Sequence, residues 1–402
     1  MITVQEAEQL VFANVCGWGD ETVPLYAAQG RILLDDIAAD RNYPPYHRVT
    51  MDGIAIASSA WLKGLRRFRV ESVVQAGASI ATLRDTANGC LEIMTGAVLP
   101  SGCDTIIPYE QVRLENGSAI IAEDVTATAG QFVHREGSDR AKGDILIRRG
   151  VRIAPNHVAV IASTGQAQVR VSRLPRVTIV STGDEIVDVG APVETHQIRP
   201  SNAYGIAAAF RALGCEAVEV PIVGDHRDEI FQTLEKELKQ SDILVLSGGV
   251  SMGKADYVPA SLDALGSKLI FHKVSQKPGR PMWFGVAPGG KPVFALPGNP
   301  VSSMVCFYRY ALPAIQRALG LASQPEEWAV LAEDVRSEMN LTMFRQVTIR
   351  SERDGRLVVT TDTYGGSGDI ASLGASEGFV ELPLGREKAP AGEVVRLHRW
   401  RV

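Results

Sequence analysis

A regular alternation of short apolar strands and amphipathic helices between residues 175 and 319 limits the possible folds of this chain more than any other feature. Val177–Val180 is a β-branched run and Ile243–Leu246 an apolar run, both of strand length, and Asp228–Lys239 gathers its apolar residues on one helical face. Strands that alternate with helices form a mostly parallel sheet that is covered on both faces. We therefore expect a central three-layer α/β domain whose ligand binds beyond the carboxyl ends of the strands.

Three further elements complete this predicted domain. Ser201–Leu213 has a helix-cap signal at its start and Gly214 after its end, which predicts a helix. Ala217–Val223 reads as the next strand, and Val301–Leu319 as an apolar helix with Pro300 at its favoured first position. The sequence thus predicts repeated strand-helix units.

The segments on either side of that domain have a different pattern. The chain opens with a helix for which Thr3 and Glu6 form a capping box, and Met51–Gly150 is rich in glycine and short β segments. Past Gly320 the helical pattern stops, and short strands with hairpin turns follow. We expect a multidomain α/β protein with an inserted N-terminal, mainly β domain and a C-terminal β domain.

Charge and composition exclude several classes of protein. The net charge of -5 provides no basic field for a nucleic-acid backbone. The five cysteines include no C-x-x-C pair, which favours reduced thiols over a disulfide framework or a zinc site. No apolar run approaches the roughly 20 residues that span a bilayer, and the first residues lack the basic region of a signal peptide. We expect a cytoplasmic protein with neither nucleic acid nor membrane as a partner.

A glycine-rich loop, Ser247-Gly-Gly-Val-Ser-Met-Gly253, follows one of the buried strands. Glycine permits positive φ and lets a ligand approach backbone N–H groups closely, as a bound phosphate requires. A plain strand-to-helix turn is the alternative for an isolated pair of glycines. The loop residues that we expect to bind substrate are Ser247, Gly248, Gly249, Ser251 and Gly253.

Two proline-containing loops follow the next strands. Lys273, Lys277 and Arg280 lie in the run 272–281, and cations held on a stiff loop need little reorganisation when a polyanion binds. A solvated basic loop is the alternative interpretation. Pro297 and Pro300 belong to Leu296-Pro-Gly-Asn-Pro300, which opens a helix at the same edge of the sheet.

Four carboxylates occupy equivalent positions after the strands, namely Asp184, Glu185, Asp225 and Asp256. Acidic groups beside a phosphate site imply a divalent cation or a proton between them, so we expect a Mg²⁺-like ion. Helix capping explains Asp184 and Asp225 equally well, whereas we favour function for Glu185 and Asp256. The expected metal ligands are therefore Glu185 and Asp256.

Five motifs span nearly the whole chain in a fixed order. They are Met51-Asp-Gly53, Thr95-Gly-Ala-Val-Leu-Pro100, the glycine-rich loop with Asp256-Tyr-Val, Lys277-Pro-Gly-Arg-Pro281 and Leu296-Pro-Gly-Asn-Pro300. In these motifs the chain resembles the molybdopterin molybdotransferase family, to which the E domain of gephyrin is also similar. The resemblance implies that adenylylated molybdopterin and molybdate are converted into molybdenum cofactor, with release of AMP that depends on Mg²⁺ or another divalent cation.

The resemblance also implies roles for individual residues. The four carboxylates match the family's acidic active-site positions, and Lys273 and Lys277 match its substrate-binding lysines. Arg280 stands where the family usually has lysine, which keeps the charge and changes its geometry. Residues implied to contact molybdate are Arg345 and Ser372, with Lys277 and the Pro297 loop opposite; a surface arginine and a turn serine are the alternative.

A homodimer is implied as well, in which Asp52, Thr95 and Asp139 of one subunit complete the site of the other. Contacts with molybdopterin adenylyltransferase and with acceptor molybdoenzymes are further expectations. The implied segments are a linker and dimerisation domain (1–44 with 140–172), an inserted β domain (45–139), a molybdopterin-binding α/β domain (173–322) and a C-terminal β domain (323–402).

Besides Arg280, three residues depart from the family pattern and put local contacts in question. Ile54 stands where tyrosine is common and Ser138 where glutamate is common, both close to the implied subunit contacts. Glu377 replaces a frequent asparagine and adds negative charge near the expected oxyanion pocket.

Two other functions remain open from the sequence. The central domain is similar to molybdopterin adenylyltransferase, so a nucleotidyltransferase is the enzymatic alternative, although the flanking β domains argue against it. A non-catalytic scaffold of the gephyrin type is the other alternative, against which stands the retention of Asp256, Lys273 and Lys277.

Overall fold

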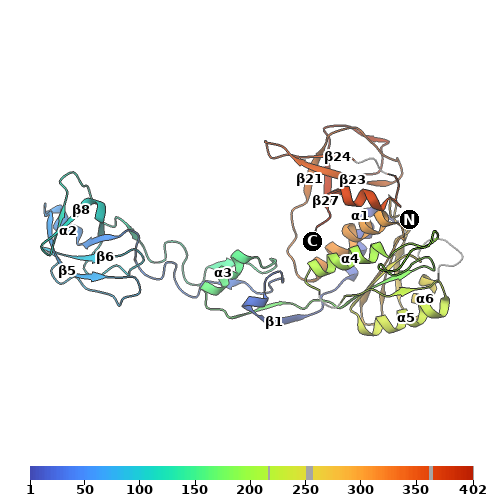
Figure 1. Cartoon of the computed structure of the whole chain (residues 1–402), viewed down its shortest axis with the longest axis horizontal. Helices are drawn as coiled ribbons and strands as arrows, with labels where there is room; N and C mark the ends of the chain where they lie inside the picture. The colour runs from blue at the N-terminus through green and yellow to red at the C-terminus, as the bar shows by residue number, and fades with distance from the viewer. Residues whose placement is uncertain (216–217, 250–256, 362–364, 402) are drawn as a thin grey trace. The chain divides into compact units, whose positions relative to one another are not determined.

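The structure is a computed structural model that describes residues 1–215, 218–249, 257–361 and 365–401 (Figure 1). The chain divides into two compact units, each described here by itself. The first contains Met1–Asp35, Arg149–Val158 and Gln168–Val402, and the second contains Asp36–Arg148 and Ala159–Ala167. The four segment boundaries expected from the sequence stay a prediction. Among the described residues no helix has the length and apolar character needed to cross a membrane, and all five cysteines are free thiols.

The second unit is built mainly of β structure, as predicted. Its principal sheet has six strands in the order β7-β4-β6-β5-β9-β8. Apolar residues pack on both faces of β4, with Ile54 and Ile56 on one face and Ala55 on the other. The elements are β2 (Ile37–Ala38), β3 (Arg48–Val49), β4 (Gly53–Ile56), α2 (Ser58–Leu62), β5 (Arg67–Val74), β6 (Gly89–Ile93), β7 (Thr105–Pro108), η2 (Tyr109–Gln111), β8 (Val112–Glu115), β9 (Ser118–Ile121), β10 (Val133–His134) and β11 (Ile145–Ile147).

The first unit is organised around a mixed sheet in the order β14-β13-β16-β20-β19-β17, with β15 also paired to β13. The strands from β14 to β20 run parallel, and β19 and β17 extend the sheet in antiparallel fashion. This confirms the predicted mostly parallel sheet. The strands are β13 (Val177–Thr182), β14 (Val218–Glu219), β15 (Ile222–Val223), β16 (Ile243–Ser247), β17 (Lys268–His272), β19 (Trp283–Ala287) and β20 (Lys291–Leu296).

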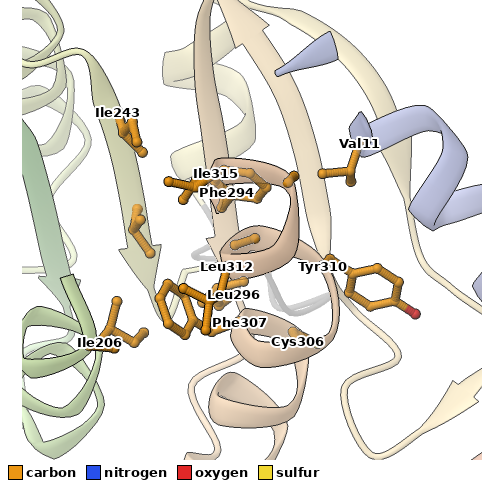
Figure 2. Close-up of a cluster of buried hydrophobic side chains, with 14 of the residues drawn as sticks. Val11, Ile206, Ile243, Phe294, Leu296, Cys306, Phe307, Tyr310, Leu312 and Ile315 are labelled. Carbon is orange, nitrogen blue, oxygen red and sulfur yellow. The ribbon is translucent and has the colours of Figure 1, made fainter. Parts of the chain in front are cut away.

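Helices cover both faces of this sheet and give it three layers. Ile179 and Val245 point to a core shared with α1, α4, α7, η3 and α8, several of whose side chains are shown in Figure 2. Val180 and Leu246 point to the other core, formed with α5 and α6. The helices are α1 (Val4–Asn14), α4 (Ser201–Ala212), α5 (Arg227–Gln240), α6 (Val258–Ala264), α7 (Pro300–Cys306), η3 (Phe307–Ala311) and α8 (Leu312–Ala318).

Thr3 caps α1 as predicted, and the capping box with Glu6 is complete. Two local predictions need correction, and one predicted helix is refined. Pro200, not a hydroxyl side chain, occupies the N-cap of α4, and Ser201 is the first residue of that helix. The strand expected at Ala217–Val223 is two short strands, because Pro221 lacks the N–H that would continue the ladder. The helix from Pro300 contains a π-helical turn, η3.

The C-terminal β domain is closed on itself, in agreement with the predicted β character. β23 pairs with both β24 and β25, and β21 and β27 connect these two strands, so five strands form a barrel. A sixth strand, β18, comes from the loop between β17 and β19 and pairs in parallel with β23. The elements are β18 (Gln276–Lys277), β21 (Glu327–Leu331), β22 (Val335–Arg336), β23 (Thr342–Ser351), β24 (Leu357–Thr361), α9 (Ile370–Ala375), β25 (Gly378–Leu382), β26 (Lys388–Ala389) and β27 (Val394–Arg399).

The remaining elements are two paired strands of the first unit, a short 3-10 helix and a helix shared by the two units. β1 (Asp20–Pro24) pairs antiparallel with β12 (Gln168–Ser172), and η1 (Leu25–Ala27) follows β1 directly. α3 (Pro155–Ser163) is divided between the two units.

Candidate active site

A cavity of about 1300 Å³ opens at the carboxyl ends of the parallel strands of the first unit. Loops that follow β13, β16 and β20 line it, as expected for a sheet of this type. The run 276–281, the loop 366–368, residues 197–202 and Glu338 also contribute to the lining. The predicted site residues that line the cavity are Glu185, Asp225, Ser247, Gly248, Gly249, Lys277, Arg280, Pro297 and Pro300.

The two glycines after β16 are required by the local geometry. Gly248 has φ +103° and Gly249 has φ +66°, both in the region that favours glycine. A Cβ on Gly248 would lie 2.8 Å from the carbonyl oxygen of Thr182, and a Cβ on Gly249 would lie 2.7 Å from Val258. Neither position has space for a side chain, and both glycines line the cavity. Ser251, Gly253 and Asp256 lie outside the described residues.

Unpaired oxygens of buried side chains line the same cavity. Ser181 Oγ, Thr182 Oγ1 and Asn202 Oδ1 have no hydrogen-bond partner among the residues that the structure describes, although each residue is at least nine-tenths buried. Leaving such an oxygen without a partner costs about 1–3 kcal/mol. A ligand with hydrogen-bond donors, or a cation, would satisfy them.

Asn202 joins the two glycine-containing loops. Its Nδ2 donates to Ser247 Oγ at 3.0 Å and to the carbonyl oxygen of Gly298 at 2.7 Å. The sequence interpretation missed Asn202, as well as Ser181 and Thr182. A polar residue on the buried face of α4 was the available signal for Asn202.

Two cations of the predicted basic loop border the cavity, and both are exposed. Lys277 Nζ lies 2.6 Å from Glu338 Oε1, a carboxylate that also lines the cavity and that the sequence interpretation did not identify. Lys273 is not among the lining residues. It has φ +77°, and its N–H donates to the carbonyl oxygen of Met282 at 2.9 Å.

The carboxylates separate into two groups. Glu185 and Asp225 line the cavity, whereas Asp184 does not. Asp184 Oδ1 accepts a hydrogen bond of 2.8 Å from the N–H of Asp225, so it fixes the loop after β15. Neither aspartate caps α5, whose N-cap is His226. Within the described ranges, no three histidine, cysteine, aspartate or glutamate side chains are close enough together to hold a metal ion.

The two residues implied to contact molybdate lie in the C-terminal domain, and neither is among the lining residues. Ser372 Oγ donates to Gln346 Oε1 at 3.0 Å and to the carbonyl oxygen of Asp369. Arg345 donates to the carbonyl oxygen of Arg336 at 3.3 Å. Glu377 is not a lining residue either. Its carboxylate accepts a hydrogen bond of 2.7 Å from the N–H of Ile349.

The residues implied to complete the site from another subunit lie in the second unit. Asp52 Oδ1 accepts a hydrogen bond of 2.6 Å from the N–H of Thr95, and this bond lowers the pKa of Asp52 below its ordinary value. Asp139 Oδ1 lies 2.8 Å from His134 Nε2. Ile54 is fully buried in the core of the sheet, whereas Ser138 is exposed.

Comparison with known proteins covers the whole chain. Residues 2–165 match the model of the MoeA N-terminal region (domain I and II), 178–317 the probable molybdopterin binding domain, and 328–400 the MoeA C-terminal region (domain IV). A molybdopterin molybdenumtransferase of Synechocystis sp. is 36% identical over 100% of both chains. One from Haemophilus influenzae is 31% identical over 99% of this chain and 98% of its own.

A solved structure agrees with these matches. The molybdopterin biosynthesis MoeA protein from Pyrococcus horikosii superimposes with a TM-score of 0.85 at 29% identity, and 100% of each chain is covered. The family models, the full-length relatives and the solved structure therefore all indicate the same family. The chain belongs to the molybdopterin molybdenumtransferase family, a family of transferases of molybdenum cofactor biosynthesis.

Proposed function

We propose that this protein converts adenylylated molybdopterin and molybdate into molybdenum cofactor and releases AMP. The observation that carries the proposal is the cavity in which Gly248, Gly249, Lys277 and Arg280 meet buried oxygens without partners. Family membership supplies the substrate class, because the relatives are molybdopterin molybdenumtransferases.

The chemistry of this reaction suits the lining of the cavity. Cleavage of the phosphoanhydride requires compensation of negative charge on phosphate oxygens. Backbone N–H groups beside Gly248 and Gly249 and the side chains of Lys277 and Arg280 provide that compensation in our proposal. No nucleophile from the protein is required, so the residues act by binding and orienting the two substrates.

A divalent cation such as Mg²⁺ fits the donors of this cavity. Hard cations prefer carboxylate and hydroxyl oxygens, and Glu185, Asp225 and the unpaired hydroxyls of Ser181 and Thr182 supply such oxygens. We propose that Glu185, with Asp256, holds the ion. When bound, the ion would offset the charge of the phosphate oxygens.

The implied roles of the remaining residues are part of the same proposal. Arg345 and Ser372 would contact molybdate after a rearrangement, because neither lines the cavity. Asp52, Thr95 and Asp139 would reach the cavity of the other subunit in a homodimer. We further propose that the protein works in the cytoplasm and exchanges intermediates with molybdopterin adenylyltransferase and with acceptor molybdoenzymes.

A direct assay tests the proposed reaction. Purified protein is mixed with adenylylated molybdopterin, Mg²⁺ and molybdate, and AMP release is followed together with activation of a cofactor-free molybdoenzyme. We expect both signals for the wild type, a loss of at least about tenfold in kcat/KM for Lys277→Met, and no change for the exposed lysine variant Lys268→Met.

Other outcomes of that assay decide against the proposal. No AMP release above a control without protein would overturn it. In a parallel assay with molybdopterin and ATP, consumption of ATP would identify a nucleotidyltransferase instead, and a folded protein without either activity would favour the scaffold.

A further inference from the structure

Three buried polar side chains form a network beneath the basic loop of the cavity. Gln276, Cys306 and Tyr310 have no exposed surface. Gln276 lies in the loop, directly before Lys277, whereas Cys306 and Tyr310 lie at the end of α7 and in η3. Figure 2 shows Cys306 and Tyr310 leaving the same helical segment, with the hydroxyl of Tyr310 directed away from the labelled apolar residues.

The hydrogen bonds of this network end on the backbone of the loop. Tyr310 Oη donates to Gln276 Oε1, and Gln276 Nε2 donates to the carbonyl oxygen of Pro278 at 3.1 Å. Gln276 Nε2 also contacts Cys306 Sγ at 3.5 Å, and that thiol donates to the carbonyl oxygen of Gly279 at 3.4 Å. Pro278 and Gly279 stand directly between Lys277 and Arg280.

The direction of these bonds is fixed by the groups involved. The carbonyl oxygen of Pro278 can only accept, so the amide nitrogen of Gln276 must face it and the amide oxygen must face Tyr310. Burial raises the pKa of Tyr310 well above its ordinary value, and burial raises the pKa of Cys306 to about 12. Both groups therefore keep their protons and remain donors at neutral pH.

The loop backbone packs against the network without space for a side chain. Gly279 has φ +89°, and a Cβ there would lie 2.5 Å from Cys306 Sγ and 2.7 Å from Gln276 Nε2. Apolar side chains of the same shape would fill this space but would leave the carbonyl oxygens of Pro278 and Gly279 without donors. What the polar network adds is a set of directional bonds to the backbone that carries Lys277 and Arg280.

We propose that Tyr310 and Gln276 are positioning residues of the transfer reaction, which hold Lys277 and Arg280 in the arrangement that binds the anionic substrate. The expected effect on KM rests on the proposed function, whereas the expected effect on the loop backbone does not. Gln276 is also one of the residues that line the cavity, and its side chain is bonded to Tyr310 and to the loop backbone.

Substitution of single hydroxyls tests the kinetic part. Tyr310→Phe leaves Gln276 Oε1 without its donor, so we expect KM for adenylylated molybdopterin to rise about tenfold while kcat changes less than about twofold. Loss of folded protein alone would lower the apparent kcat and leave KM unchanged. Tyr308→Phe is the matched control, because the Tyr308 ring packs edge-on against Trp400 at 5.3 Å between centroids and belongs to no part of the network. The double variant Tyr310→Phe with Gln276→Leu removes the Tyr310–Gln276 hydrogen bond and also the donor to the carbonyl oxygen of Pro278, so it should keep the raised KM and be no more stable than Tyr310→Phe.

Hydrogen exchange tests the inference without any substrate. The N–H groups of Lys273 and Val274 donate to Met282 and Arg280 across the loop. We expect Tyr310→Phe to speed amide exchange in residues 273–282 by about tenfold and Tyr308→Phe to leave it unchanged. Unchanged exchange in Tyr310→Phe overturns the inference. A wild type that releases no AMP overturns the proposed function instead, and the exchange result still decides the role of the network.

Discussion

Arg309 and Glu381 form a buried ion pair in which Arg309 Nε lies 2.9 Å from Glu381 Oε2. The arginine is 1% exposed and the glutamate 8%. Glu8 of α1 adds a second carboxylate, with its Oε1 2.6 Å from Arg309 Nη1. A charge removed this far from water is stabilising only while its partners are in place. The pair therefore connects α1, η3 and the C-terminal barrel.

Glu381→Gln should destabilise the protein by about 3 kcal/mol, because Arg309 keeps only Glu8 as a counter-charge. Denaturant unfolding measures this difference. Glu352→Gln provides the control, since Glu352 pairs with Arg350 at 2.7 Å on the surface and should contribute less than about 1 kcal/mol. Equal losses in the two variants would contradict the burial argument.

Acid should unfold the protein in two overlapping stages. Burial acts to raise the pKa of Glu381, but His398 and Arg309 outweigh it and lower that pKa from 4.5 to about 2. The unfolded state therefore binds the proton first, and stability on the order of 3 kcal/mol is lost as pH falls from about 4.5 to 2. Burial also lowers the pKa of His398 from 6.5, so loss of stability begins below pH 6.5. Unfolding midpoints measured from pH 8 to pH 3 should fall, and they should fall less steeply below pH 4.5 in Glu381→Gln.

Thr182→Val and Thr178→Val should have opposite effects although both residues belong to β13. Thr182 Oγ1 lines the cavity without a partner, so valine should leave stability unchanged or slightly higher and raise KM about three- to tenfold. Thr178 Oγ1 donates to Glu237 Oε2 at 3.0 Å, so valine there should cost about 1–3 kcal/mol and leave KM unchanged. Thermal unfolding together with AMP-release kinetics checks both variants. Loss of stability in Thr182→Val would show that its hydroxyl has a structural partner.

Gly248→Ala should reduce both stability and activity far more than Gly290→Ala. Both glycines have positive φ, +103° and +76°, so the strain of an L side chain is present in both variants. A Cβ on Gly248 also meets the carbonyl oxygen of Thr182 at 2.8 Å, whereas a Cβ on Gly290 meets nothing within 4 Å. We expect about 1 kcal/mol for Gly290→Ala and at least about 3 kcal/mol for Gly248→Ala. Unfolding curves of similar midpoint would contradict the close approach of the loop to β13.

Glu338→Gln should tighten substrate binding. The carboxylate of Glu338 competes with an anionic ligand for Lys277, and its removal leaves that cation free of its partner. KM should fall about two- to fivefold, and stability should change by less than about 1 kcal/mol because both side chains are about half exposed. Asp334→Asn removes the comparable pair with Lys388 elsewhere in the C-terminal domain and should leave KM unchanged. A rise of KM in Glu338→Gln would mean that the glutamate helps to bind substrate.

Local patterns were sufficient to predict the layers of the fold. The helix expected at Asp228–Lys239 is observed at Arg227–Gln240, because its apolar spacing depends only on neighbouring turns. Asn202 and Glu338 could not be found in this way. Asn202 contacts residues 45 and 96 positions away, and Glu338 pairs with a lysine 61 positions away. The sequence showed which loops meet at the edge of the sheet, but not which side chains bridge them.

Strand β18 links the central sheet to the C-terminal barrel, so substitutions in the barrel can alter the basic loop. Its residues lie in the connection between two strands of the central sheet, yet their ladder partners belong to β23 of the barrel. Lys277 is thus held in register by Met343, a residue of the C-terminal domain. Substrate affinity should therefore depend on the position of β23 in that domain. Substitutions in the core of the barrel should change the KM for substrate even where they do not unfold the protein.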